Sequence, residues 1–251
     1  MVNFVGAGPG AVDLITVRGQ ELLKSADIII YAGSLVNPEL LTWAKEECQI
    51  YNSAKMTLEE VIDVMRGGEA EGKMTVRLHT GDPSVYGAIR EQMDMLDQLE
   101  IPYQVVPGVS SFCGAAAATK KEYTLPSVSQ SVIITRMAGR TPVPEKESIK
   151  SFAAHQATMV IFLSTGLVKE VSEQLITGGY KEDTKAAIVY KATWPEEKVV
   201  YGTVGTLEQM AKDNNITKTA LILVGEFLGN EYDKSLLYDK TFTHEFRKGI
   251  E

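Results

Sequence analysis

The residues whose types suit them to chemistry gather in the stretch from Met74 to Gly87, which contains His79 and Asp82. The histidine is a candidate general base, and the aspartate is a candidate ligand-binding residue. The stretch starts as a β-branched run, breaks at Gly81 and is predicted to resume as a helix from Ala88 to Leu99. A strand that runs through a glycine turn into a helix is where α/β proteins hold small ligands.

Asp82 also has a purely structural interpretation. An Asp-Pro pair is typical of a helix start, because the carboxylate caps free N–H groups and the missing donor of Pro83 costs nothing at the first helical position. Taken alone, the pair predicts only a cap. Two neighbouring loops change that interpretation.

A second loop of this kind follows a predicted strand at Val2–Val5 and runs through Gly6 to Gly10. With Ala11 it satisfies a relaxed dinucleotide-binding pattern, but the rest of that pattern is missing. The next helix starts only near Thr16, and the strand at Ile28–Tyr31 ends without the acidic residue that would hold a ribose hydroxyl. A third loop follows the predicted strand at Tyr103–Val106. We therefore expect several ligand loops and no dinucleotide site.

These loops must be positioned by alternating strands and helices. A capping box at Thr57 and Glu60 predicts the start of a helix, and Gly67-Gly68 predicts its end. Thr206 with Gln209 is a second capping box and predicts a helix that ends near Asp213. Polar residues from Lys120 to Ser127 are the candidate linker between an N-terminal α/β domain, 1–120, and a C-terminal α/β domain, 121–251. Before the linker, Asn37-Pro38 predicts the start of a further helix. Beyond the linker we expect strands at Ser131–Thr135, Met159–Leu163, Ala186–Tyr190, Lys198–Tyr201 and Ala220–Val224, with helices at Glu145–His155 and Gly166–Thr177.

Composition excludes several classes of function. The 251 residues are 44% hydrophobic and 23% charged, as in an ordinary globular protein, and the net charge of −8 argues against a nucleic-acid partner. No basic segment precedes the first apolar run, and no stretch approaches the roughly 18 apolar residues of a membrane helix. Cys48 and Cys113 form no CxxC pair and are expected to be buried thiols of a cytoplasmic protein. No metal-ligand spacing and no Ser–His–Asp order is present, so no metal site is expected.

Three motifs follow one another along the first half of the chain: Val5-Gly6-Ala7-Gly8-Pro9-Gly10, then Gly81-Asp82-Pro83 with Tyr86-Gly87, and then Pro107-Gly108-Val109-Ser110-Ser111. In this order and spacing they resemble the motifs of the tetrapyrrole (corrin/porphyrin) methylases, and the similarity extends over nearly the whole chain. The resemblance implies a class III methyltransferase fold, in which two small α/β domains, usually in a homodimer, hold S-adenosylmethionine in the cleft between them.

Within this family, four segments are most similar to the branch that methylates carbon C11 of precorrin-4 or cobalt-precorrin-4 in cobalamin (vitamin B12) biosynthesis. These segments are His79–Pro83, Thr135-Arg136 with Gly139–Pro144, Phe162-Leu163-Ser164, and Tyr190-Lys191-Ala192-Thr193-Trp194-Pro195. The resemblance therefore implies a corrinoid or other tetrapyrrole substrate and a C-methyltransferase activity. It leaves open whether the substrate carries cobalt.

The resemblance also assigns residues to the methyl donor. It places the methionine part of S-adenosylmethionine against Pro9, Gly81, Asp82, Val85, Ser110 and Ser111, with Tyr86 in the same cofactor site. It places the adenosine part near Leu163, Ala192, Ala220 and Leu221.

A sulfonium donor needs no protein nucleophile, because its methyl group is already activated and has only to be held in line with a ring carbon. The candidate catalytic residues are therefore His79, Asp82, Arg136 and Arg140. His79 can remove a proton from the macrocycle or position its loop, and the absence of a visible partner favours the second role. Arg136 and Arg140, in one loop, suit the carboxylates of the substrate, whereas Lys120 and Lys121 are expected to be surface charges.

Two alternatives stay open at this point. One is a sister methylase that acts at another ring carbon. The other is a non-catalytic module that binds a tetrapyrrole or a nucleotide, and the three intact loops argue against it, since such a module has no need of a sulfonium pocket.

Overall fold

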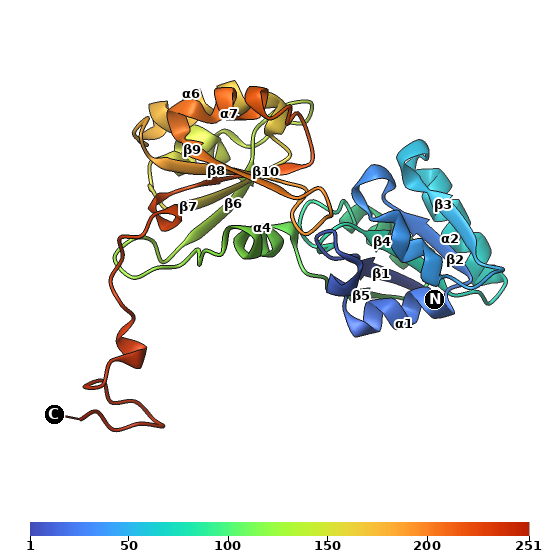
Figure 1. Cartoon of the computed structure of the whole chain (residues 1–251). Coiled ribbons are helices and arrows are strands. Elements are labelled where there is room, and N and C mark those ends of the chain that lie inside the picture. The colour runs from blue at the N-terminus through green and yellow to red at the C-terminus, as the bar shows by residue number, and fades with distance from the viewer. Residues whose placement is uncertain (251) are drawn as a thin grey trace. The chain divides into compact units, whose positions relative to one another are not determined.

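The protein is described by a computed structural model, which covers residues 1–250 and, at Ser34, the backbone alone. The chain divides into two compact units: Met1–Ala115 with Lys191–Glu197, and Ala116–Tyr190 with Lys198–Glu251. Helix α4 (Ser111–Thr119) runs from the first unit into the second. Each unit is built on one five-stranded sheet (Figure 1). Among the described residues, no helix is both long and apolar enough to cross a membrane.

The sheet of the first unit is entirely parallel, in the strand order β3-β2-β4-β1-β5. Its strands are β1 (Val2–Gly6), β2 (Ile28–Tyr31), β3 (Gln49–Asn52), β4 (Thr75–His79) and β5 (Tyr103–Val106). Its helices are α1 (Val17–Ser25), α2 (Leu58–Ala70) and α3 (Arg90–Gln98), with 3-10 turns at Val12–Leu14, Gly33–Leu35, Pro38–Trp43 and Ser53–Lys55.

Both faces of this sheet are covered, as a parallel sheet requires. Leu23 of α1 packs with Val5, Val76 and Leu78 on one face. On the other face, α2 and α3 pack against Phe4 and its neighbours. Because successive side chains of a strand point to opposite faces, the polar residues of β4 that alternate with Val76 and Leu78 lie on the α2/α3 face.

The sheet of the second unit is mixed, in the order β6-β7-β10-β8-β9, with only β6 and β7 parallel. Helices α5, α6 and α7 cover one face and share a core with β7, β8 and β10. The strands are β6 (Val132–Arg136), β7 (Thr158–Phe162), β8 (Lys185–Tyr190), β9 (Lys198–Thr203) and β10 (Ala220–Val224). The helices are α5 (Ile149–Ala153), α6 (Val168–Gly178) and α7 (Leu207–Asp213), with 3-10 turns at Glu145–Glu147, Thr165–Leu167, Val204–Thr206, Glu226–Leu228 and Leu236–Tyr238.

Local sequence signals were right where they depended on neighbouring residues. The Thr57–Glu60 capping box is formed, and the Asn37 side chain accepts the amide of Glu39 at the start of its 3-10 turn. Strands Ile28–Tyr31, Tyr103–Val106 and Ala220–Val224 have the expected bounds. The α/β class with two sheets is confirmed.

Several predictions were wrong. Helix α2 continues past Gly67-Gly68 to Ala70, because Gly68 packs closely against Ile28 and Thr75 instead of ending the helix. Thr206 does not cap α7, since its hydroxyl pairs with Thr203 at the preceding 3-10 turn. Strand β3 was not predicted: all four of its residues are exposed or half-buried, so its sequence has no apolar run of the kind that a buried strand requires.

The two cysteines also differ from the prediction. Cys113 is exposed and Cys48 is half-buried. Burial raises the pKa of the Cys48 thiol above its ordinary value, so this cysteine is a poor nucleophile at neutral pH.

Candidate functional site

The three ligand loops predicted from the sequence follow the carboxyl ends of strands in the first sheet. Strands β1, β4 and β5 are adjacent and parallel, so their carboxyl ends lie together. From the neighbouring strands β1 and β4 the chain continues to opposite sides of the sheet, to β2 and to β5. This reversal is a topological switch point, where open α/β sheets bind ligands.

Backbone contacts among four glycines hold the loops together. Gly8 and Gly81 exchange two hydrogen bonds, with N···O distances of 2.8 and 3.3 Å. A Cβ at Gly6 would lie 2.6 Å from the Cα of Gly108, and a Cβ at Gly108 would lie 2.2 Å from the carbonyl oxygen of Gly81. Gly81 also has a φ of +60°, which favours glycine. Larger residues at these positions would force the loops apart.

Asp82 does not cap a helix, which corrects the sequence-based prediction. Helix α3 begins eight residues later, at Arg90, and is preceded by Ile89. The Asp82 carboxylate accepts the amide of Gly108 at 2.8 Å, and its other oxygen accepts the amide and hydroxyl of Ser84. Partial burial acts to raise the pKa of Asp82, but these hydrogen bonds outweigh it and keep the pKa below its usual value. Asp82 is therefore an ionised tie between two loops and a weak base.

The other predicted donor-binding residues of this unit lie in the same loops or directly after them. Pro9 and Ser110 are buried, and Val85 and Ser111 are half-buried. Gly81 lies beside the third loop, because a Cβ there would be 3.4 Å from the amide nitrogen of Ser111. Tyr86 is 43% exposed and has a φ of +56°.

Part of the site comes from far along the chain. The loop Lys191–Glu197 belongs to the first unit and packs on the glycine loop after β1. Thr193 Oγ1 accepts the amide of Ala11 at 3.0 Å, and Trp194 Nε1 donates to the carbonyl of Pro9 at 3.2 Å. Ala192, a predicted adenosine contact, is buried in the same loop.

Gly10 is required by this packing. A Cβ at Gly10 would lie 2.1 Å from Cδ1 of Trp194, and the side chain of Asn37 donates to the Gly10 carbonyl at 2.9 Å. The sequence predicted for Asn37 only the start of a helix, and for Thr193 and Trp194 no role beyond a place in a family-like segment. The only signal was the family-like segment around Trp194, because its partners are more than 180 residues away.

His79 ends β4 and is only 4% exposed. Burial, helped by the charge of Arg77, lowers the pKa of its imidazole to about 3. Its ring lies 6.1 Å from that of Phe4, and its Nε2 has no hydrogen-bond partner among the described residues. An imidazole that is this buried and this weakly basic does not suit the role of general base, because an effective base has a pKa near the operating pH.

The two candidate arginines of the second unit have different surroundings. Arg136 donates to the carbonyls of Met137, Thr141 and Pro142 at 2.8 to 3.3 Å, so it folds its own loop. Arg140 is exposed and makes no hydrogen bond or ion pair with the described part of the chain. Of these two arginines, only Arg140 has a guanidinium that is available to bind a ligand.

Three predicted adenosine contacts also lie in the second unit. Leu163 follows β7 with a φ of +53° and is 66% exposed, an unusual state for a leucine. Ala220 and Leu221 are buried in β10, and Ala220 faces the core under α5, α6 and α7. As neighbours in a strand they point to opposite faces, so they cannot both reach one ligand through their side chains.

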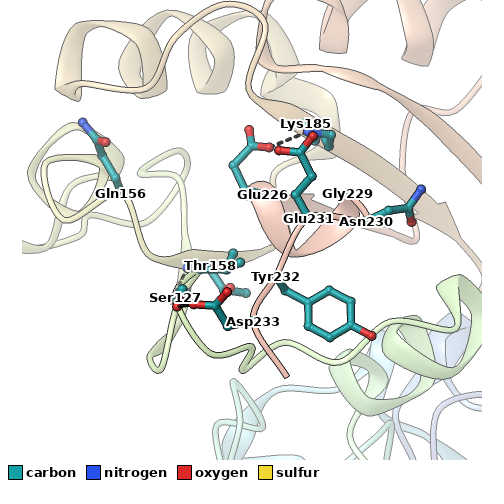
Figure 2. A pocket seen from close by; sticks show the side chains of 12 residues that line it. Ser127, Gln156, Thr158, Lys185, Glu226, Gly229, Asn230, Glu231, Tyr232 and Asp233 are labelled. Carbon is teal, nitrogen blue, oxygen red and sulfur yellow. Dashed lines mark hydrogen bonds and ion pairs between the residues drawn. The ribbon is translucent and has the colours of Figure 1, made fainter. Parts of the chain in front are cut away.

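A separate polar pocket of about 690 Å³ lies in the second unit and contains none of the predicted site residues. Figure 2 shows the ion pair between Lys185 and Glu226 at its edge. The lining residues are Ser127, Val128, Ser129, Gln156, Thr158, Lys185, Glu226, Gly229, Asn230, Glu231, Tyr232 and Asp233. Its one lysine is paired, so the pocket offers no free cation to an anionic ligand. Within residues 1–250, no cluster of three or more acidic, histidine or cysteine side chains could hold a metal ion.

The chain is similar to known proteins in both sequence and fold. Residues 1–208 match the family model of the Tetrapyrrole (Corrin/Porphyrin) Methylases. A cobalt-precorrin-4 C(11)-methyltransferase of Methanocaldococcus jannaschii is 54% identical over 98% of this chain and 96% of its own length. A solved cobalt precorrin-4 methyltransferase aligns with a TM-score of 0.89 at 47% identity, over 91% of this chain and 96% of that one. A uroporphyrin-III C-methyl transferase from Thermus thermophilus, complexed with S-adenyl homocysteine, aligns with a TM-score of 0.74 at 25% identity, over 90% and 92% of the two chains.

Proposed function

We propose that this chain, which belongs to the tetrapyrrole (corrin/porphyrin) methylase family, transfers a methyl group from S-adenosylmethionine to carbon C11 of precorrin-4 or cobalt-precorrin-4 in cobalamin biosynthesis. The observation that supports this most directly is the meeting of the Gly6, Gly81 and Gly108 loops at the switch point of the first sheet. These loops carry the family motifs, and one of them contains an ionised carboxylate.

The residues present fit the methyl donor. The contacts among the three loops are made by glycines, so backbone atoms lie where side chains would otherwise stand. Asp82 stays ionised at neutral pH, and a fixed negative charge favours a cationic ligand at this edge. In this proposal Pro9, Gly81, Asp82, Val85, Ser110 and Ser111 hold the methionine part. Leu163 and Ala192 contact the adenosine part, and the strained, exposed backbone position of Leu163 is consistent with such a contact.

The donor brings a methyl group that is already activated for displacement, so the chain's own residues bind and orient. Asp82 keeps two of the donor loops in register through the amide of Gly108. Arg140 supplies a free guanidinium for a carboxylate of the macrocycle, while Arg136 shapes the loop that carries it. His79 ends β4 just before the donor loop and positions the start of that loop as a buried, neutral group.

Methyl transfer with a labelled donor tests the proposal. The purified chain is incubated with labelled S-adenosylmethionine and with each ring intermediate in turn, and the new methyl group is located by NMR. We expect label at C11 of precorrin-4, of cobalt-precorrin-4, or of both. Label at another ring carbon would make the chain a sister methylase. Binding of a tetrapyrrole without transfer would make it a binding module.

Two further properties rest on the family. We propose that the chain forms a homodimer in solution and acts in the cytoplasm. Light scattering on the purified protein tests the first property, and a mass of twice 27.5 kDa is expected. Calorimetry tests donor choice, with S-adenosylhomocysteine expected to bind and NAD expected not to.

A further inference from the structure

Strand β4 carries a buried cation that no carboxylate of residues 1–250 balances. Arg77 lies in the middle of the strand and is 7% exposed, and no described acidic side chain forms an ion pair with it. Buried charges in proteins are normally paired, because desolvation of a lone charge is costly. Burial alone lowers the pKa of Arg77 to about 10, so the guanidinium remains charged at neutral pH. A position this costly needs a physical reason.

The guanidinium is held by neutral oxygens on two other elements. Arg77 Nη1 donates to the carbonyl of Ile30 in β2 at 3.2 Å, and Nε donates to Gln92 Oε1 in α3 at 3.1 Å. Gln92 Nε2 in turn donates to the carbonyl of Ala88 at 2.9 Å. The orientation of the Gln92 amide follows from chemistry, because an arginine can only donate and a carbonyl can only accept. Arg77, Gln92 and Ala88 therefore form a directed chain of hydrogen bonds.

This chain ends on a strained turn. Tyr86 has a φ of +56° and Ala88 a φ of +49°, in the left-handed region that non-glycine residues seldom adopt. Such residues keep this conformation only where their surroundings enforce it. The turn lies in the loop that also holds Asp82 and Val85. That loop is tied at its start by Asp82 to the amide of Gly108 and at its end by Gln92 to Ala88.

We propose that Arg77 and Gln92 are positioning residues for the methyl donor. From inside the sheet they hold the Tyr86–Ala88 turn in its strained shape, so that the donor loop has its binding conformation before the donor arrives. Pre-organisation of this kind improves affinity because less ordering is left to occur on binding. The inference rests on the proposed function, since it takes the ligand of this loop to be S-adenosylmethionine.

A purely structural role predicts a different outcome, and one substitution separates the two. In Gln92→Glu the new carboxylate pairs with Arg77, which removes the uncompensated charge. It cannot donate to the Ala88 carbonyl, so the turn loses its tie. Gln92→Leu loses both contacts. If Gln92 only stabilises the fold, donor affinity follows stability and Gln92→Glu binds like the wild type.

The experiment measures S-adenosylhomocysteine affinity by calorimetry and stability by urea unfolding for both variants. We expect the dissociation constant to rise about 3- to 10-fold in each, which corresponds to the loss of one neutral hydrogen bond. Gln92→Glu should be at least as stable as the wild type. The donor KM should rise by the same factor, while kcat at saturating donor changes less than about twofold. Hydrogen exchange at the amides of residues 86–88 should become faster in both variants.

Gln104 supplies a matched control. It is also a glutamine of the first unit, and its Nε2 donates to the side chain of Asn3 toward the amino ends of the strands, away from the donor loops. Gln104→Leu should lower stability and leave S-adenosylhomocysteine affinity unchanged. If the wild type binds the ligand and Gln92→Glu binds it equally well, the positioning role is wrong while the proposed function stands. If the wild type itself does not bind, the proposed function fails first and the donor role of Arg77 and Gln92 falls with it.

Discussion

The tie between Asp82 and Gly108 offers a sharp test of how the donor loops are held. In Asp82→Ala the amide of Gly108 loses its side-chain acceptor, 26 residues away in the chain, and Ser84 loses an acceptor for its amide and its hydroxyl. Ser84 is exposed, so water replaces its lost contacts. The Gly108 amide is partly buried between the loops, so the loss of its hydrogen-bond acceptor dominates the effect on stability.

The magnitude follows from the charge of the acceptor. A hydrogen bond to a charged group contributes about 1.5–3 kcal/mol to stability. We therefore expect Asp82→Ala to lower the free energy of unfolding of the first unit by about 2–3 kcal/mol, more than the roughly 1 kcal/mol of a lost helix cap. Asp82→Asn keeps one acceptor oxygen for Gly108 in neutral form and should cost about 1 kcal/mol. Ser84→Ala should cost less than about 0.5 kcal/mol.

Tryptophan fluorescence provides a selective assay. Trp43 and Trp194 are the two tryptophans of the chain, and both lie in the first unit. Urea unfolding followed by fluorescence therefore reports the unit that contains Asp82, through Trp43 directly and through Trp194 where its loop packs on Pro9. Calorimetry with S-adenosylhomocysteine gives the functional effect, which we expect to exceed a tenfold loss of affinity in Asp82→Ala and to be smaller in Asp82→Asn.

The pH dependence has a defined sign. Because the folded pKa of Asp82 is depressed, its contribution is fully present above the unfolded pKa of about 3.9 and is lost as the pH falls through the folded value. The wild-type advantage over Asp82→Ala should thus be constant from pH 5 to 8. A folded Asp82→Ala with wild-type stability and wild-type affinity would refute the view that this carboxylate ties the loops.

Three further outcomes are expected. Gly108→Ala should lower the free energy of unfolding by about 3 kcal/mol and weaken donor binding, because its Cβ would lie 2.2 Å from the carbonyl oxygen of Gly81. Gly67→Ala in α2 is the control, and it should stabilise by about 1 kcal/mol because no atom lies within 4 Å of its new Cβ. Equal effects of the two variants in urea unfolding would contradict the predicted crowding at Gly108. The neutral, buried His79, with a pKa of about 3, should make wild-type stability fall by about 2 kcal/mol from pH 7 to pH 5, because only the unfolded state takes up the proton there, and His79→Phe should lack this part of the slope. Arg140→Ala should weaken macrocycle binding about 10- to 100-fold with S-adenosylhomocysteine affinity unchanged; a parallel loss of both would mean that the loop supports the donor site.

Much of the secondary structure could be predicted because it depends on residues close together in the chain. The Thr57–Glu60 box is such a case, since both partners lie within one helical turn. Short apolar runs such as Ile28–Tyr31 likewise predict strands through their own composition. The sequence motifs also identified the family, which the comparisons confirm.

Local signals failed where a distant partner determined the outcome. Gly67-Gly68 has the composition of a helix end, yet Gly68 packs against Ile28 and Thr75 and the helix continues. Asp82-Pro83 has the composition of a helix start, yet the carboxylate binds the amide of Gly108. In both cases the tertiary contact outweighs a local preference that is itself worth only about 1 kcal/mol.

By itself, the sequence determined the family, the alternation of strands and helices, and the three loops that carry the motifs. Only the tertiary structure decided that Gly6, Gly81 and Gly108 touch and that Trp194 packs against Gly10. It also decided that Arg77 is buried with no ion-pair partner in the described part of the chain. The physical reason is that strand order and crossover direction are set by how the apolar faces of whole elements pack. No window of neighbouring residues contains that information.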